Sequence, residues 1–191
     1  MKRQIKKSWK TRIAELALPI LWAILPGCKG HVEVGISSND PYGSKYVEYN
    51  PSRGGEVVVG IKEGETGLGL EAGLNVSSSH AYTNGTYIDN KDFMYDIRAS
   101  YTKKSGILSV KPYVSGGNMW TVSEINIPNL GIRETQQSNT SYAGIGCDIG
   151  VKITNKGEIY AGAEHDWLGI GEDSENVNGI WRYKLGWRQT F

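Results

Sequence analysis

The chain has 191 residues, with 21 lysines and arginines against 20 aspartates and glutamates, and a formal net charge of +1. This length fits one domain, and the near balance of charge gives no indication of a nucleic-acid partner. Since the sequence contains no His and Cys cluster with metal-ligand spacing and no phosphate-binding loop, we also expect no metal and no cofactor.

The first 27 residues are predicted to be a signal peptide. Six basic residues and no acidic one occur in residues 1–12, the ten residues from Leu16 to Leu25 form an apolar run, and Pro26-Gly27-Cys28 follows. This layout is typical of export, and the run is shorter than the roughly 20 residues of a membrane-spanning helix. A retained N-terminal anchor is the alternative. Removal of residues 1–27 would leave a domain over residues 28–191 with 15 basic and 19 acidic residues.

Cys28 is the candidate for lipid attachment. Leu25-Pro26-Gly27-Cys28 resembles the processing box of lipoproteins, which implies that Cys28 is acylated and becomes the first mature residue. The only other cysteine, Cys147, is predicted to face lipid from a strand, where a thiol behaves as a small hydrophobe. A Cys28–Cys147 disulfide is the alternative in an oxidising compartment.

Alternation of apolar and polar residues predicts eight strands after the signal. In residues 140–153, for example, Ile145 and Ile149 point to one face while Gly146 and Asp148 point to the other. Pro112 cannot donate a ladder hydrogen bond, so we expect either a bulge there or an error in its strand. The predicted strands are 31–38, 55–62, 66–78, 91–103, 106–120, 140–153, 158–168 and 181–191.

The connections alternate in length. Short turns are predicted at 63–65, 103–106 and 154–157, and long polar loops at 39–54, 79–90, 121–139 and 169–177. Short turns at one end and long loops at the other are typical of an all-β, eight-stranded antiparallel up-and-down transmembrane β-barrel.

The last strand indicates which side of the barrel meets lipid. Trp181, Tyr183, Leu185, Trp187 and Phe191 share one face, whereas the bases Arg182, Lys184 and Arg188 share the other. This suits a barrel with lipid outside and an ion-paired interior. A soluble lipocalin-like barrel, which needs an apolar interior, is the alternative.

The alternating residues that end on Phe191 resemble the C-terminal recognition strand of bacterial outer-membrane barrels, although Gln189 departs from the pattern. In pattern the chain resembles the small OmpX-type and opacity-type barrels. The resemblance implies location in the bacterial outer membrane, contact with its lipid and lipopolysaccharide, and recognition of the last strand by the barrel-assembly machinery.

Two groups of side chains complete the predicted barrel. Aromatic belts at the two membrane interfaces are expected from Phe93, Trp120, Trp167 and Trp181 at the loop end and from Tyr101, Trp187 and Phe191 at the turn end. Eight strands enclose a space just wide enough for side chains, so we expect the inward charges to form an ion-pair network rather than an ion path. The predicted network comprises Glu71, Asp96, Arg98, Lys111, Asp148, Lys152, Glu158, Glu164, Asp166, Arg182, Lys184 and Arg188.

His165 is the one catalytic candidate. The segment Ala163-Glu164-His165-Asp166-Trp167-Leu168-Gly169 resembles part of the lipid A 3-O-deacylase barrels, in which an outward His, a Ser two residues later and a Glu on the next strand form a triad. Trp167 occupies the Ser position here, and strand 181–191 offers Trp181 and Tyr183 where the carboxylate is needed. Acyl transfer lacks its nucleophile and orienting acid, so we do not expect an enzyme.

The sequence therefore predicts a non-catalytic outer-membrane barrel whose surface loops serve adhesion, recognition or envelope structure, with an unknown extracellular ligand. Tyrosines in or beside the first two loops would suit protein or glycan contact. They are Tyr42, Tyr46, Tyr49, Tyr82 and Tyr87. A deacylase-like hydrolase built around His165 and a minimal ion channel are the alternatives.

Overall fold

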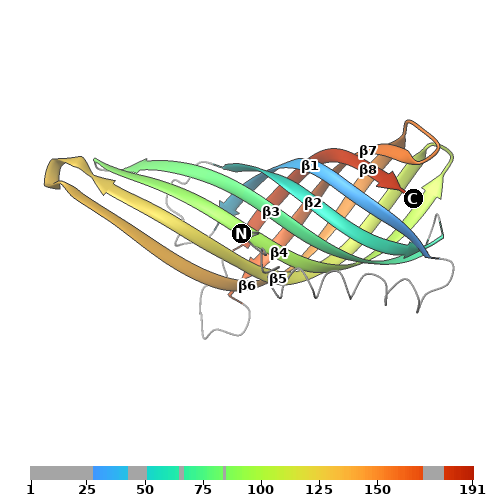
Figure 1. The fold of residues 1–191 in the computed structure, drawn as a ribbon, viewed down its shortest axis with the longest axis horizontal. Helices are drawn as coiled ribbons and strands as arrows, with labels where there is room; N and C mark the ends of the chain where they lie inside the picture. The colour runs from blue at the N-terminus through green and yellow to red at the C-terminus, as the bar shows by residue number, and fades with distance from the viewer. Residues whose placement is uncertain (1–27, 43–50, 65–66, 84, 170–178) are drawn as a thin grey trace, which may run out of the picture.

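Eight antiparallel strands form a closed ring (Figure 1). The structure is a computed structural model that describes residues 28–42, 51–64, 67–83, 85–169 and 179–191. Each strand pairs with the next along the chain, and β8 pairs back with β1, which confirms the predicted fold class. The strands are β1 (Cys28–Tyr42), β2 (Ser52–Glu63), β3 (Gly67–Thr83), β4 (Thr86–Ser105), β5 (Leu108–Ile127), β6 (Ile132–Lys152), β7 (Gly157–Leu168) and β8 (Gly179–Thr190).

Parts of the sequence-based prediction lie outside the described residues. They are the signal peptide, residues 43–50 of the first loop with Tyr46 and Tyr49, residues 65–66, residue 84, and residues 170–177 of the last loop. No helix within the described part of the chain is long and apolar enough to cross a membrane.

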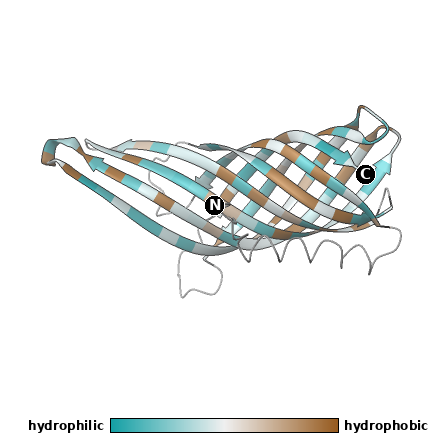
Figure 2. Cartoon of the chain, in the orientation of Figure 1, coloured by the Kyte–Doolittle hydropathy of each residue, from teal (hydrophilic) through white to brown (hydrophobic). Residues whose placement is uncertain are grey.

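The two faces of the barrel wall have opposite polarity. On the outer face, Ile36, Leu68 and Ile97 are 66%, 69% and 65% exposed, whereas the inward Arg98 and Asp148 are fully buried. In Figure 2 the apolar patches are most frequent on the barrel wall. A water-soluble barrel has the reverse arrangement, so the lipocalin-like alternative is wrong, and the outer wall is suited to contact with lipid.

Four strands continue well beyond the rest of the ring at the loop end (Figure 1). Residues 79–90 and 121–139 were expected to be loops, but β3 and β4 pair as far as Thr83 and Thr86, and β5 and β6 as far as Ile127 and Ile132. The prediction was wrong because these segments lack a regular row of apolar residues, and β6 is exposed on both faces from Ile132 to Asn139. A short 3-10 helix, Pro128–Leu130, closes the longer hairpin.

The opposite end of the barrel has tight connections, as predicted. β4 and β5 are joined through Gly106 and Ile107, and β6 and β7 through Ile153–Lys156. Gly106 has a φ of 63°, a left-handed conformation that glycine adopts without strain. We call this end the turn end, and the opposite end, where β3, β4, β5 and β6 protrude, the loop end.

Pro112 causes neither a bulge nor a break in β5. The pairing with β6 keeps one register on both sides of Pro112, from Lys111↔Asp148 to Tyr113↔Gly146. The pairing with β4 also keeps its register, but the ladder is interrupted between Ser100↔Tyr113 and Lys103↔Val110. The expected bulge is therefore wrong, and a short gap in the β4 ladder accommodates the missing N–H.

Replacement of Gly146 tests how tightly the side chains of the interior are packed. A Cβ atom at Gly146 would collide with the Tyr113 ring, whereas at Gly116, on the outer face, it would meet only the Tyr142 carbonyl oxygen at 3.9 Å. Gly146→Ala is expected to lower the free energy of unfolding by about 1–3 kcal/mol because the ring must shift. Gly116→Ala should change it by no more than about 0.5 kcal/mol. Urea unfolding in lipid vesicles, followed by tryptophan fluorescence, measures both; equal effects would contradict the packing described.

Candidate functional site

Lys111 is the centre of a buried charge cluster toward the turn end. Its Nζ atom lies within 3.3 Å of carboxylate oxygens on three different strands. These are Glu33 of β1 (2.6 Å), Glu71 of β3 (3.1 Å) and Asp148 of β6 (3.3 Å). Because β5 is opposite β1 in the ring, the Lys111–Glu33 pair crosses the barrel.

Arg188 completes this turn-side cluster from β8. Its guanidinium lies 2.5 Å from Glu33 Oε1 and 2.9 Å from Asp148 Oδ2, and it also contacts Glu158 of β7. The Tyr160 ring lies beneath the guanidinium, with its centroid 4.8 Å from Cζ. Arg188 and Lys111 therefore share two carboxylates, which connects strands on all sides of the interior.

A second cluster lies toward the loop end and is built around two arginines. Arg98 contacts Glu56 at 2.7 Å and Asp96 at 2.9 Å. Arg182 contacts Asp166 at 2.5 Å, with Asp96 at 3.5 Å. This loop-side cluster joins β2, β4, β7 and β8.

Lys184 and Tyr113 connect the two clusters. Lys184 Nζ lies 3.5 Å from both Asp148 of the turn-side cluster and Glu164, and it donates a hydrogen bond to the Tyr113 hydroxyl. That hydroxyl in turn donates to Glu164 Oε2 at 3.0 Å. Side chains from non-neighbouring strands thus meet across the middle of the barrel, an arrangement that fills the interior and does not favour a wide aqueous channel.

Eleven of the twelve predicted interior residues are buried, and Lys152 is half-buried at the turn end. The buried charged set among the described residues also includes Glu33, Glu56 and Lys62, which the sequence analysis did not identify. A signal was available for Glu33 and Glu56, because each occupies an alternate position beside outward valines. Eight buried carboxylates and six buried lysines and arginines result.

The seven predicted interface aromatics lie at the two ends of the barrel wall, six on strands and Phe191 directly after β8. At the loop end, Phe93 and Trp120 are cross-strand partners with ring centroids 5.6 Å apart. At the turn end, Tyr101 and Phe191 are exposed, and Trp187 donates a hydrogen bond to Gln189 at 3.3 Å. Trp167 and Trp181, also at the loop end, flank His165.

His165 lies between two tryptophans on the outer face of the barrel. Its ring contacts Trp167 and Trp181 edge-on, at centroid distances of 4.4 Å and 4.7 Å. Trp181 is its cross-strand partner on β8, and Ile145 its partner on β6. Neither strand therefore places a carboxylate or a nucleophilic hydroxyl directly beside the imidazole, and the deacylase triad is not reproduced at these positions.

His31, Glu33 and Glu71 form a group that the sequence analysis did not identify. Their ligand atoms lie within 4.8 Å of one another, a spacing that could hold a metal ion. However, the Lys111 ammonium already lies between the two carboxylates, and His31 Nε2 is 3.3 Å from Glu71 Oε1. We therefore interpret the group as part of the turn-side cluster.

Cys28 begins β1, and Cys147 lies on the outer face of β6. Both thiols are free, and β1 and β6 are not neighbours in the ring, so the alternative disulfide is wrong. Alternation along β1 places Cys28 in the same row as the exposed Val34 and Ile36. Acylation of Cys28 stays a prediction, and its position would direct an acyl chain toward the lipid.

The protruding part of the sheet is the second candidate site. Its strands are β3 from Ser79, β4 to Asp92, β5 from Thr121 and β6 to Thr140. β7 begins to pair with β6 only at Tyr142, so among the described residues no strand pairs with the outer edge of Ile132–Thr140. Arg133 bridges from this edge strand to Glu124 of β5 at 3.1 Å. That hydrogen bond, with Lys91 nearby, lowers the pKa of Glu124.

The structure is similar to solved outer-membrane barrels. A major outer membrane protein of Thermus thermophilus matches with a TM-score of 0.64 at 15% identity, over 86% of this chain and 99% of that chain. Ail, the attachment invasion locus protein of Yersinia pestis, in complex with the heparin analogue sucrose octasulfate, matches with a TM-score of 0.61 at 12% identity, over the same shares. Neisserial surface protein A matches with a TM-score of 0.57 at 14% identity, again over 86% and 99%.

The sequence matches no protein-family model, and no curated protein matches it. Identities this low establish the fold alone. The chain has the fold of small eight-stranded outer-membrane β-barrels, which confirms the predicted resemblance. Outer-membrane location follows from this fold together with the apolar outer wall.

Replacement of Lys111 tests the buried network. Lys111→Met leaves three carboxylates around an uncharged side chain, so we expect the free energy of unfolding to fall by about 3–5 kcal/mol. Arg133→Met is the control, because it removes an exposed ion pair and should cost less than about 1 kcal/mol. Urea titrations of both variants in the same lipid vesicles measure the difference. Similar losses would show that the network does not stabilise the barrel.

Conductance tests the filled interior. Purified wild-type protein in planar lipid bilayers is expected to show no steady single-channel conductance, because side chains meet across the barrel at both clusters. A large outer-membrane porin in the same bilayers is the positive control. Steady, large openings by this protein would contradict the closed interior and favour the channel alternative.

Proposed function

We propose that this outer-membrane barrel is a surface recognition protein, which binds an extended segment of another protein along the free edge of its protruding sheet. The observation that carries the proposal is the edge of β6 over Ile132–Thr140, which has a paired strand on one side only among the described residues. An edge of nine residues is about 30 Å long. Backbone donors and acceptors along such an edge can pair with an added strand.

This edge carries few of the features that prevent strand addition. Natural edge strands are usually protected by lysines, prolines, bulges or a covering segment. Ile132–Thr140 contains no proline, no glycine and no lysine, and its register with β5 is continuous. Arg133 and Glu134 are its only charged residues, and both lie near the tip. The stretch from Thr135 to Thr140 is therefore an uncharged, uninterrupted template.

Aromatic side chains on the β3–β4 hairpin of the same protruding sheet could add side-chain contacts. Tyr82 of β3 and Tyr87 of β4 are cross-strand partners with ring centroids 4.6 Å apart, and they are 61% and 51% exposed. Exposed tyrosines are enriched where proteins bind one another. The attachment role in the name of the Yersinia pestis barrel is compatible with an adhesive partner here.

Selection of peptides from a random phage-displayed library tests the proposal and does not require the partner to be identified. Wild-type protein in detergent micelles is expected to enrich a pool of peptides that form extended strands. A variant in which residues 121–138 are replaced by Asn-Gly joins the cross-strand partners Trp120 and Asn139 by a two-residue turn and removes the edge from Ile132 to Ser138. This variant should bind that pool at least about tenfold more weakly, a loss of about 1.4 kcal/mol.

Proline substitution separates the edge from the rest of the hairpin. Gln136→Pro and Gln137→Pro are made singly, since backbone N–H groups point alternately toward β5 and toward the free edge. One of the two should abolish peptide binding while the barrel stays folded, and the matched Gln136→Ala and Gln137→Ala variants should bind normally. Peptides that bind the shortened hairpin as tightly as the wild type would contradict strand addition at this edge.

A further inference from the structure

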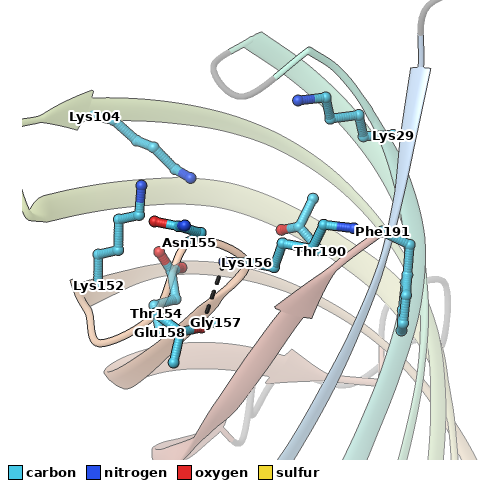
Figure 3. A pocket seen from close by; sticks show the side chains of 10 residues that line it. All are labelled: Lys29, Lys104, Lys152, Thr154, Asn155, Lys156, Gly157, Glu158, Thr190 and Phe191. Carbon is cyan, nitrogen blue, oxygen red and sulfur yellow. Dashed lines mark hydrogen bonds between the residues drawn. The ribbon is translucent and has the colours of Figure 1, made fainter.

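The turn end of the barrel contains a basic cavity of about 360 Å³ (Figure 3). Four lysines from four segments line it: Lys29 at the start of β1, Lys104 near the end of β4, Lys152 at the end of β6 and Lys156 in the β6–β7 turn. In Figure 3 the amines of Lys104 and Lys152 point toward the same space beside Asn155, and Lys156 extends toward Thr190. This cavity lies at the opposite end from the protruding sheet and does not depend on it.

Three of these lysines have no acidic partner within the part of the chain that the structure describes. Among the described residues, no carboxylate lies within ion-pair distance of Lys104, Lys152 or Lys156. Glu158 is the one acidic side chain that lines the cavity, and it is bound by Arg188. Lys62, which is 4% exposed, adds a further positive charge that interacts with that of Lys104. The cavity is therefore strongly positive, in contrast to the interior beneath it, where every described base except Lys62 contacts carboxylates.

The donors in the cavity suit a phosphate group. Three ammonium groups, the hydroxyls of Thr154 and Thr190 and the Asn155 amide can together surround an anion with several charged oxygens. Lysine binds phosphate as a point charge from varied directions and needs no planar, bidentate geometry.

An apolar groove adjoins the cavity on the outer face. Val32, Val59, Ile61 and Leu70 line this groove, and Phe191 lines both the groove and the basic cavity. A molecule with a phosphate in the cavity could therefore place an acyl chain against the barrel wall. A phospholipid has this chemistry, and a soluble phosphate would use the basic cavity alone.

We propose that Lys104, Lys152 and Lys156 form a binding site for a phosphate group at the turn end, with the phosphate supplied by a phospholipid headgroup or by a soluble phosphate. The test uses the full barrel in micelles of a phosphate-free detergent, titrated calorimetrically at low salt with inorganic phosphate or with short-chain phosphatidylglycerol. Lys104→Gln/Lys152→Gln should weaken binding about tenfold or more, and added salt should weaken binding to the wild type.

Lys103→Gln is the matched control for charge. Lys103 is adjacent in sequence but exposed on the outer face of β4, so its replacement should leave binding unchanged. Binding of both ligands with similar affinity would identify the phosphate alone as sufficient, whereas binding of phosphatidylglycerol only would identify the lipid as the source. Absence of saturable binding for both ligands, or equal weakening by Lys103→Gln, would overturn the proposal.

A measurement on the wild-type protein covers the case in which the double variant does not fold. Bound ligand should slow chemical acetylation of Lys104 and Lys152 at least about threefold relative to Lys103, read by mass spectrometry, because a bound phosphate blocks their amines. Equal acetylation rates with and without ligand would also overturn the proposal.

Discussion

Lys111 and Arg188 each contact three carboxylates from three strands, and two of those carboxylates, Glu33 and Asp148, are shared. The rest of the structure depends on this interaction. Because lipid surrounds the barrel, the outer face of its wall must be apolar, and the polar side chains of the strands must point into the interior. In an eight-stranded barrel the interior is just wide enough to hold them. The closed ring therefore brings these charges together from several strands, and the filled interior leaves the two ends of the barrel as the accessible surfaces.

The two ends offer different chemistry because the strands differ in length. β7 ends at Leu168, whereas β6 pairs with β5 back to Ile132, so the loop end has a protruding sheet with a mostly uncharged edge that no described strand covers. The turn end has tight connections that bring Lys104, Lys152 and Lys156 around one cavity. Backbone pairing is available at the first end and electrostatic binding at the second. The buried network between them provides a rigid support for both.

Alternation in the sequence was sufficient to predict all eight strands, because the apolar row recurs wherever a strand has lipid on one side and the interior on the other. It failed in the protruding sheet, where β6 is exposed on both faces from Ile132 to Asn139 and no apolar row recurs. It also indicated which charges face inward, but not their partners: Lys111 and Glu33 are 78 residues apart in sequence. The free edge of β6 and the basic cavity depend on the relative lengths of strands and on three-dimensional convergence, which local patterns do not encode.

A spin-label accessibility scan along β6 tests the central claim most directly, since this strand crosses the lipid and continues into the protruding sheet. Single cysteines at residues 132–152, introduced after Cys28→Ser and Cys147→Ser, would be labelled in lipid vesicles and exposed to a lipid-soluble and a water-soluble relaxation agent. The account predicts alternating lipid contact from Ala143 to Val151 and water contact at every position from Ile132 to Thr140. One uniform pattern along the whole strand, alternating or not, would contradict it.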